Sequence, residues 1–317
     1  MTLIDQIMDM SRQNNIGELS PWFKNRLEDL VYDGTYPSEE TIQDAIMPKI
    51  VEQLRLYSEQ TGRNTVVIGM SGGVDSALVA ALFKKADWKV VGVTMPIHQD
   101  QAETDRGMEA CEALGIEHRH IDLTALYDAT VETEKALDTN LELDDKAARI
   151  RKGNIRARLR MITLYNLASA EHGLVASTDN FSELSSGFFT LHGDVGDLAP
   201  IQSLTKSWEV PMMAKLIGVP EKTWRATPTD GLGIDAGDEA QLGASYLEWD
   251  IMLLSAAVIE SFDEGSREDV VESAVFDRMK LTWFKRMNPV MLDHPFQKRY
   301  EYLNNLDNLV RPKMFRQ

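Results

Sequence analysis

The spacing of apolar residues predicts that helices and short apolar strands alternate through the first part of the chain. Some segments carry apolar residues at helical spacing, whereas others are brief β-branched runs. Helices are expected within residues 1–30 and over residues 40–61, 75–86, 102–114, 124–137 and 144–172. Strands are expected over residues 65–70, 89–95, 117–123 and 174–179. Strands that alternate with helices pair in parallel, so we expect an α/β fold with a doubly wound parallel sheet flanked by helices.

The pattern changes after this region. A helix is expected over Phe181–Phe189, and the stretch from His192 to Gly243 is rich in loop-forming residues, which is typical of lids and binding elements. Residues 238–288 return to helical spacing, with apolar positions suited to a core. The chain shows no repeat and no Pro/Ser-rich linker. We therefore expect one domain over residues 41–317, preceded by a helical extension over residues 1–40.

The segment from Thr65 to Ser76 carries the strongest candidate chemistry. An apolar run is followed by Ser71-Gly72-Gly73 and then by a helix-forming stretch, so a turn joins a strand to a helix. Two glycines let the backbone approach an anion, and the free N–H groups at the helix start favour a phosphate. No lysine stands in the turn, so it is not a Walker A loop.

Asp75 stands in this turn, where a carboxylate would repel phosphates unless a divalent cation lay between them. The turn therefore predicts Mg²⁺ and pyrophosphate chemistry. A glycine-rich turn without a ligand is the alternative, but Ser, Gly-Gly, Asp and Ser together at a strand-to-helix junction favour the ligand site. Because ligands of open α/β sheets bind beyond the carboxyl ends of the strands, Ser71–Ser76 and Ser177–Glu183 are expected to meet in one crevice.

Composition narrows the class of protein. With 317 residues, of which 43% are hydrophobic and 26% charged, the chain can bury a sizeable core. It has no apolar run long enough to span a membrane and no basic-then-apolar N-terminus, so we expect neither a membrane span nor a secretory signal, and a cytoplasmic location. Cys111 is the single cysteine and lies in a helix-like stretch, where we expect a buried, inert thiol.

The charge pattern bears on the ligand. The formal charge is −17, from 33 basic and 50 acidic residues, which argues against non-specific binding of nucleic acid. An anionic ligand must then meet a local basic patch, and residues 151–160 supply five cations. On a helix, Arg151 and Arg158 share one face, whereas Arg156 and Arg160 pair at i, i+4. The alternative is that the whole run faces solvent.

The turn Ser71–Ser76 resembles the PP-loop of ATP pyrophosphatases, enzymes that cut ATP between its α and β phosphates to activate a carboxyl or carbonyl group as an adenylate. Seven further segments share their order and spacing with one group in that superfamily. They are Lys152–Met161, Ser177–Glu183, Gly187–Thr190, Gly193-Asp194, Leu204–Lys206, Ala226–Asp230 and Asp238–Gly243. Together they are similar to NAD synthetases of the ammonia-dependent type. The resemblance covers roughly residues 45–290 and leaves the first 40 residues outside.

This resemblance implies a reaction and a set of ligands. The family activates the nicotinate carboxylate of deamido-NAD⁺ with ATP, releases pyrophosphate and lets ammonia displace AMP. The residues implied for the ATP phosphates are Gly69, Ser71, Gly72, Gly73, Val74, Asp75 and Ser76. The resemblance also implies that Asp75 and Glu183 ligate Mg²⁺, and two carboxylates on converging loops can hold a hard cation against the phosphates.

Further positions match the family's contacts to ATP. Thr178, Lys206 and Thr229 do so, the lysine as a point charge for phosphate and the threonines as neutral donors. Asp179 is a speculative helper in the deprotonation of ammonia, and its alternative role is the N-cap of the following helix. The candidate catalytic residues are therefore Asp75, Lys206 and Asp179.

One arginine of the basic run takes a role from the resemblance. Arg158 matches an arginine that binds deamido-NAD⁺, whereas Arg156 and Arg160 keep the assignment to a solvent-facing side.

Two other positions match contacts to deamido-NAD⁺. Asp197 matches across a one-residue gap, which leaves Asp194 as the competing candidate. Lys285 matches the second contact, and the alternative is that it is an ordinary surface lysine near a helix end.

Two departures from the family pattern concern the dinucleotide. A lysine expected after Thr190 is Leu191, and a histidine expected before Lys285 is Phe284. Each removes a polar contact, and losing one charge-assisted hydrogen bond costs about 1.5–3 kcal/mol. We expect weaker or re-routed binding of the dinucleotide with the adenylation machinery intact, and His192 could partly substitute.

The nitrogen source follows from what the chain lacks. A glutamine-using version needs an amidohydrolase domain with a catalytic cysteine, and the sequence has only Cys111 and no room for that domain. We therefore expect ammonia as the substrate, free or delivered by a separate subunit. The resemblance also implies a homodimer whose partner chain forms part of the dinucleotide site.

Two other functions stay open at this point. The first is a PP-loop ATP pyrophosphatase that adenylates another acceptor, such as a tRNA base or xanthosine monophosphate, and the acidic composition counts against RNA. The second is an ATP-binding regulatory protein, which Leu191 and Phe284 would allow. The presence of both Asp75 and Glu183 counts against it, because binding alone does not require a pair of metal ligands.

Overall fold

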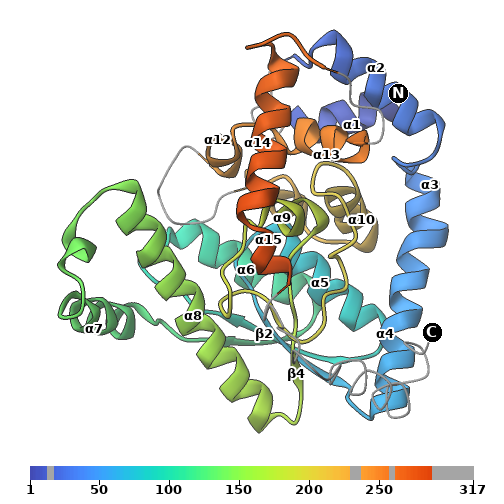
Figure 1. The fold of residues 1–317 in the computed structure, drawn as a ribbon. Helices are drawn as coiled ribbons and strands as arrows, with labels where there is room; N and C mark the ends of the chain where they lie inside the picture. The colour runs from blue at the N-terminus through green and yellow to red at the C-terminus, as the bar shows by residue number, and fades with distance from the viewer. Residues whose placement is uncertain (13–17, 229–236, 257–260, 288–317) are drawn as a thin grey trace, which may run out of the picture.

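The computed structural model describes residues 1–12, 18–228, 237–256 and 261–287. At the centre of this described part lies a parallel sheet with the strand order β3-β2-β1-β4 (Figure 1). The strands are β1 (Thr65–Gly69), β2 (Lys89–Thr94), β3 (Glu117–His120) and β4 (Leu174–Val175). The predicted α/β fold with a parallel sheet is confirmed.

Strand β4 is shorter than predicted. Only Leu174 and Val175 pair with β1, although the apolar pattern predicts a strand to residue 179. Beyond them, Ala176 forms an isolated bridge with Leu198, and the N–H of Ser177 donates to the Leu198 carbonyl at 2.8 Å. The Ala176 N–H still donates to the Val67 carbonyl of β1 at 3.0 Å, and the chain leaves the sheet at Ser177, whose N–H bonds to the Leu198 segment.

Helices cover both faces of the sheet. One face carries α4 (Met47–Thr61), α5 (Val74–Lys85) and α6 (Gln101–Leu114), and the other carries α7 (Thr124–Lys135) and α8 (Lys146–Ala170). Successive side chains of a strand point to opposite faces. Accordingly Val66 and Ile68 of β1 join the larger core, whereas Val67 joins the smaller core under α7 and α8.

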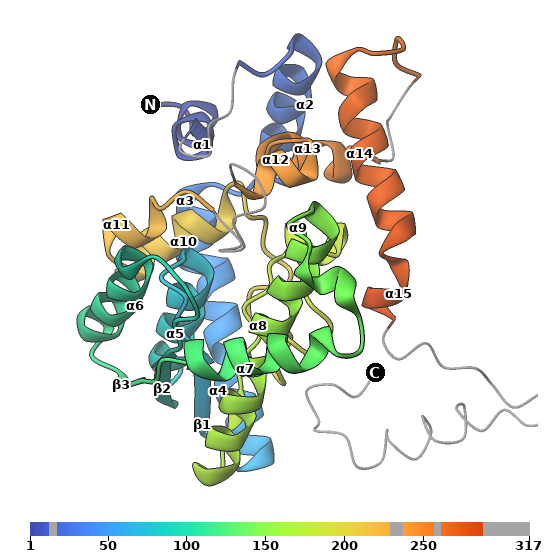
Figure 2. The same ribbon diagram turned by 90° about the vertical axis from the view of Figure 1, so that its left-hand side faces the viewer.

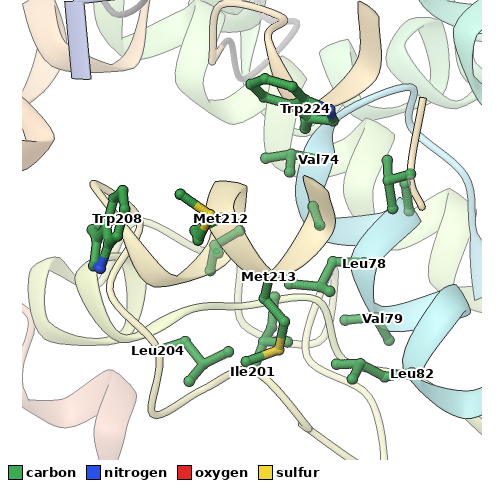
Figure 3. Close-up of a cluster of buried hydrophobic side chains, with 14 of the residues drawn as sticks. Val74, Leu78, Val79, Leu82, Ile201, Leu204, Trp208, Met212, Met213 and Trp224 are labelled. Carbon is green, nitrogen blue, oxygen red and sulfur yellow. The ribbon is translucent and has the colours of Figure 1, made fainter. Parts of the chain in front are cut away.

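Helix α10 (Glu209–Ile217) corrects the prediction of a loop-rich stretch between His192 and Gly243. Figure 3 shows its side chains interleaved with those of α5, and Met213, Leu78 and Leu82 are fully buried. Proline and glycine around this helix obscure its apolar spacing in the sequence. Two shorter helices, α11 (Glu221–Trp224) and α12 (Asp238–Leu242), lie in the same stretch.

The helical segments expected within residues 1–30 are α1 (Leu3–Arg12) and α2 (Pro21–Tyr32). Ser20 begins α2 by accepting a hydrogen bond from the N–H of Phe23. Figures 1 and 2 place both helices at the end of the molecule opposite the strands, where α2 packs against α1 and against α13 (Tyr246–Leu254). Their buried apolar side chains share the larger core with α5 and α10.

The remaining elements are short, except for α14. They are α3 (Glu39–Thr41), a π turn η1 (Ile42–Ile46), a 3-10 turn η2 (Thr139–Glu142), α9 (Phe181–Ser186), α14 (Arg267–Leu281) and α15 (Trp283–Arg286). Helix α9 ends earlier than the predicted Phe189, because Gly187 takes a left-handed conformation with φ 61°. A Cβ at Gly187 would lie 2.4 Å from the Cβ of Thr282, so α14 fixes this bend. No helix in the described ranges is long and apolar enough to cross a membrane.

Cys111 is fully buried, as predicted, and burial raises the pKa of its thiol to about 12. It packs where β2 meets α6, since a Cβ on Gly92 would lie 2.8 Å from its Sγ. A thiol with this pKa is protonated at neutral pH and therefore a poor nucleophile.

A glycine inside α6 sets how closely that helix approaches the sheet. A Cβ on Gly107 would lie 2.7 Å from the Met70 carbonyl oxygen, and the Met70 N–H is itself bonded to the Val93 carbonyl at 2.8 Å. Alanine is the better helix former by about 1 kcal/mol. The clash is with backbone that cannot move freely, so we expect it to outweigh this gain.

We therefore predict that Gly107→Ala lowers the free energy of unfolding by about 1–3 kcal/mol in urea titrations. Glu112→Ala, at an exposed position of the same helix, is the control and should change stability by less than about 0.5 kcal/mol. A Gly107→Ala protein as stable as the parent would contradict the close approach of α6.

Candidate active site

The turn between β1 and α5 is held in a single shape. Gly72 has φ 86°, and a Cβ there would lie 2.2 Å from the carbonyl oxygen of Glu103. The Ser71 hydroxyl oxygen accepts the N–H of Gly73 at 3.2 Å and contacts the Ser76 hydroxyl at 3.2 Å. Helix α5 begins directly afterwards, and the first N–H groups of a helix have no partner inside it. The turn thus has the backbone form that phosphate groups require.

The two predicted crevice segments do meet. Asp75, in the first turn of α5, accepts a hydrogen bond from the Asn180 side-chain amide at 3.0 Å. Its other oxygen pairs with the ammonium of Lys206, which also lies 3.5 Å from Oε1 of Glu183. Lys206 therefore bridges the two carboxylates assigned to a metal from the sequence.

Asn180, not Asp179, caps helix α9. The Asn180 side chain accepts the N–H of Glu183 at 3.0 Å, and the Glu183 carboxylate accepts the N–H of Asn180 at 3.3 Å. The suggestion that Asp179 is the N-cap is therefore wrong. Asp179 is 4% exposed, lines the cleft and accepts a hydrogen bond from the Ser177 hydroxyl at 3.3 Å.

Burial and mutual repulsion shift the acid–base properties of the cleft. Burial raises the pKa of Glu183 to about 8; Lys206 opposes this shift, and Asp75 adds to it. Burial also raises the pKa of Asp194 to about 7 and that of Asp179 well above its ordinary value. For Lys206, burial alone would lower the pKa, but Asp75 and Glu183 raise it, so the ammonium stays charged.

These groups line one cavity of about 480 Å³. The sequence-predicted residues on its wall are Gly69, Ser71, Gly73, Val74, Asp75, Ser76, Thr178, Asp179, Glu183, Lys206 and Lys285. Thr229 lies outside the described residues. The cavity therefore combines a phosphate-type turn, buried carboxylates and a buried ammonium.

The donor set fits a hard cation that is shared with a ligand. Asp75 and Glu183 offer carboxylate oxygens, which are the ligands that Mg²⁺ prefers. In the described part of the chain, no group of three or more His, Cys, Asp or Glu side chains is arranged to hold a metal by itself. Two carboxylates beside an anion-binding turn suit an ion whose remaining ligands are phosphate oxygens and water.

The arginines of α8 have separate roles. Arg160 is partly buried on the cavity wall, where Nε donates to the Met95 carbonyl at 3.0 Å and burial lowers its pKa to about 10. Arg156 lies over the Tyr127 ring at 5.1 Å. The assignment of both to a solvent-facing side is wrong, because α8 turns these residues toward the crevice and α7.

Arg158, which the resemblance assigns to the dinucleotide, is exposed. Its Nε donates to the Leu191 carbonyl at 3.2 Å, and the residue lies outside the cavity wall. Arg151, which shares a helical face with Arg158, is also exposed and pairs with Asp138 at 2.9 Å.

Asp197 and Asp194, the two candidates for one contact to deamido-NAD⁺, lie in different places. Asp197 accepts hydrogen bonds from the Tyr165 hydroxyl at 2.9 Å and the Val175 N–H at 2.8 Å, in a separate hollow. Asp194 lines the main cavity and accepts the Thr190 N–H at 2.8 Å. The geometry favours the competing candidate, Asp194, over Asp197.

Lys285 is not an ordinary surface lysine. It is half-buried on the cavity wall, and its ammonium donates to the carbonyls of Gly187, at 2.7 Å, and of Phe189. Burial lowers its pKa. Neighbouring Phe284 is 49% exposed.

Sequence reasoning missed several polar groups of the cavity. They include Gln99, Arg106, Asn154, Asp238 and Arg278. Arg106, for example, donates from Nε to the Gly72 carbonyl at 3.3 Å across the contact between α6 and the turn. Asn154 and Asp238 lie in segments that match the family but were assigned no role there, whereas Gln99, Arg106 and Arg278 lie outside those segments and reach the cavity only through the packing of the chain.

Comparison with known proteins places the chain in a family. The family model for NAD synthase matches residues 46–289. Among curated relatives, the NH(3)-dependent NAD(+) synthetase of Alkaliphilus metalliredigens (strain QYMF) is 35% identical over 247 residues, which cover 76% of this chain and 95% of the relative.

Solved structures agree with this match. The NH3-dependent NAD synthetase from Campylobacter jejuni subsp. jejuni aligns with a TM-score of 0.62 and 27% identity, over 78% of this chain and 98% of that one. An NMN synthetase from Francisella tularensis aligns with a TM-score of 0.65 and 27% identity, over 82% of this chain and 99% of that one. With its PP-loop turn and paired carboxylates inside the matched region, the chain belongs to the NAD synthase family.

Proposed function

We propose that this chain joins ammonia to the nicotinate carboxylate of deamido-NAD⁺, using ATP and forming NAD⁺, AMP and pyrophosphate. The observation that carries the proposal is the meeting of Asp75, Glu183 and Lys206 beside a phosphate-type turn in one cavity. Family membership and the names of the relatives support the same reaction.

The reaction has two chemical steps. A carboxylate oxygen of the nicotinate attacks the α-phosphorus of ATP, and the bond to the β-phosphate breaks, so pyrophosphate leaves. Ammonia then attacks the carbonyl carbon of the acyl adenylate, the bond to AMP breaks, and the extra proton leaves the nitrogen. Binding and orientation of the reactants supply much of the rate in such displacements.

Each side chain has a proposed task in these steps. The N–H groups of the turn and the positive end of α5 hold the phosphates. Asp75 and Glu183 would hold Mg²⁺, which offsets the charge of the departing pyrophosphate when bound. Lys206, now paired with both carboxylates, is within the same cluster and can donate to phosphate oxygens.

Asp179 is the proposed acceptor of the ammonia proton. It is buried in the cavity wall, and burial together with Asp194 raises its pKa, which brings a carboxylate closer to the range of a useful general base. Its position beside Thr178 puts it at the carboxyl end of β4, where ligands of such sheets bind.

The homodimer and the cytoplasmic location remain proposals. Support for a partner chain comes from α8, where Ile162 is 66% exposed and Tyr165 is 42% exposed on one side of the helix. Adjacent exposed apolar side chains favour contact with another surface. A monomer mass in light scattering at micromolar concentration would contradict the dimer.

A second candidate is amidation of the mononucleotide, nicotinate mononucleotide, to NMN. Two observations favour it over a wholly different acceptor: Leu191 and Phe284 replace polar family contacts to the dinucleotide, and one structural neighbour is an NMN synthetase. His192, suggested as a substitute, is exposed beside Leu191. The two substrates share the reacting carboxylate, so the same adenylation site serves either.

The proposal is tested by NAD⁺ formation from deamido-NAD⁺, ATP, Mg²⁺ and ammonium, with glutamine in place of ammonium as the comparison. We expect product with ammonium only. Asp75→Asn should lower kcat by at least about 100-fold, because the metal and Lys206 lose a charged partner. Asp277→Asn, on an exposed aspartate of α14, is the matched control and should leave the rate unchanged.

Near-parental activity of Asp75→Asn would refute its role in the metal site. Absence of NAD⁺ with the parent protein, in the presence of bound ATP, would refute the dinucleotide reaction and direct the assay to nicotinate mononucleotide.

Restoring a family residue tests the choice of substrate. We predict that Leu191→Lys raises kcat/KM for deamido-NAD⁺ about tenfold or more, since one charge-assisted hydrogen bond is worth about 1.5–3 kcal/mol. The KM for ATP should not change. Both nucleotides are assayed side by side, and an equal gain for nicotinate mononucleotide would show that Leu191 does not set the choice between them.

The crowded carboxyl groups predict a dependence of stability on pH. Their pKa values in the folded protein, about 8 for Glu183 and about 7 for Asp194, exceed the ordinary values near 4. The folded protein thus holds protons that the unfolded chain releases between these values. Its free energy of unfolding must fall as the pH rises from about 5 to 8.

We predict that Asp194→Asn reduces this fall in the free energy of unfolding between about pH 5 and 8 by more than about 1 kcal/mol, because one titrating group is removed. Urea titrations at several pH values, with chelator and without nucleotide, measure the difference between parent and variant. Parallel curves for the two proteins would show that Asp194 keeps an ordinary pKa.

A further inference from the structure

Asp250 is a buried carboxylate that does not reach the cavity. It lies on α13, is fully buried and is absent from the cavity wall. Oδ1 accepts a hydrogen bond from the Ser182 hydroxyl at 2.5 Å, and Oδ2 accepts the N–H of Ser207 at 3.1 Å. Burying a carboxylate is unfavourable unless hydrogen bonds compensate, and burial raises the pKa of Asp250 to about 6. Such a group calls for an explanation.

The two donors are the sequence neighbours of two active-site residues. Ser182 precedes Glu183, and Ser207 follows Lys206. The Ser182 hydroxyl oxygen also accepts the backbone N–H of Lys206 at 3.0 Å. Asp250 and Ser182 therefore join the start of α9 to the segment that carries Lys206.

The same segment is held from its other side by residues that precede the matched family region. The Tyr36 hydroxyl lies 3.1 Å from the Ser207 hydroxyl, and the Trp208 indole donates to the Pro37 carbonyl at 2.8 Å. Tyr36 is 1% exposed. Ser207 is thus fixed through its backbone by Asp250 and through its side chain by Tyr36.

We infer that Asp250 is a positioning residue, which sets the relation between Glu183 and Lys206 through Ser182 and Ser207. The inference rests on the proposed function, in which Glu183 holds the metal and Lys206 contacts phosphate. Displacements of about 1 Å in an active site can reduce rates 100-fold, so a shift of either backbone segment would be felt in the chemistry. Asp250 acts without touching substrate.

An Asp250→Ala variant removes both hydrogen bonds. We expect kcat for NAD⁺ formation to fall about 10- to 100-fold, whereas the KM for deamido-NAD⁺ stays within about twofold. Asp250→Asn should recover most of the rate. The oxygen of the introduced side-chain amide can accept the Ser207 N–H. The NH₂ group of that amide can donate to the Ser182 hydroxyl oxygen, which still accepts the Lys206 N–H.

A matched control separates positioning from general support of the fold. Trp249, the neighbour of Asp250 on α13, donates from its indole to the Ser185 hydroxyl on α9 at 3.0 Å. Ser185→Ala removes this buried hydrogen bond between the same two helices and the bond from the same hydroxyl to the Ser182 carbonyl within α9, at 2.9 Å, but no bond to the Lys206 segment. It should lower the melting temperature but leave kcat within about twofold.

A binding measurement tests the inference independently of turnover. Mn²⁺ is the probe, because it takes the oxygen ligands of Mg²⁺ and is detected by electron paramagnetic resonance. In the presence of a non-cleavable α,β-methylene analogue of ATP, Asp250→Ala should bind Mn²⁺ at least about tenfold more weakly than the parent or Ser185→Ala, which is about 1.4 kcal/mol.

The outcomes distinguish the inference from the proposed function. If the parent makes no NAD⁺, the proposed function fails while the Mn²⁺ comparison still tests Asp250. Equal losses in Asp250→Ala and Ser185→Ala, or no recovery in Asp250→Asn, would overturn the positioning role. Should Asp250→Ala not fold, Ser182→Ala takes its place, since it removes the hydroxyl that joins Asp250 to the Lys206 backbone.

Discussion

The ammonium of Lys206 between the carboxylates of Asp75 and Glu183 is the interaction on which this cleft depends. Two partly buried carboxylates so close together repel one another, and burial disfavours the charge on Glu183. The lysine provides the opposite charge from inside the protein. The ammonium thereby offsets the negative charge of the two carboxylates. In the proposed function, the same carboxylates bind a metal ion together with phosphate oxygens.

This balance requires three chain segments to be held in place. The parallel sheet and Gly72 fix Asp75, the capping box of Asn180 fixes Glu183, and Asp250 with Ser182 fixes the Lys206 backbone. The first device is a close backbone approach and the other two are hydrogen bonds, and none of them needs a ligand. A site arranged in advance spends less binding energy on ordering itself when substrates arrive.

The sequence predicts the parts of this site that depend on local pattern and on topology. The turn at Ser71–Ser76 is written in consecutive residues, and its meeting with Ser177–Glu183 follows from the rule for carboxyl ends of parallel strands. Arg160 could not be predicted in this way. A run of charges on a helix has the same pattern whether it faces solvent or a crevice, and only the packing of α8 on the sheet decides.

Helix α10 and Asp250 escaped prediction for a related reason. The apolar spacing of α10 is short and bordered by proline and glycine, and its nine residues are stabilised by packing on α5. Asp250 lies in a stretch of strongly apolar residues, where an aspartate suggests an exposed position. Its burial depends on hydrogen bonds to two serines far away in sequence, and such long-range bonds produce no pattern in the local sequence.

The close contact of Gly72 with Glu103 has a consequence for how this protein can evolve. Neither Gly72 nor Gly107 can gain even a methyl group without pushing α6 away from the turn. The phosphate side of the cleft is thereby closed to gradual change. New specificity is expected instead around Leu191 and Phe284, the two positions that depart from the family pattern.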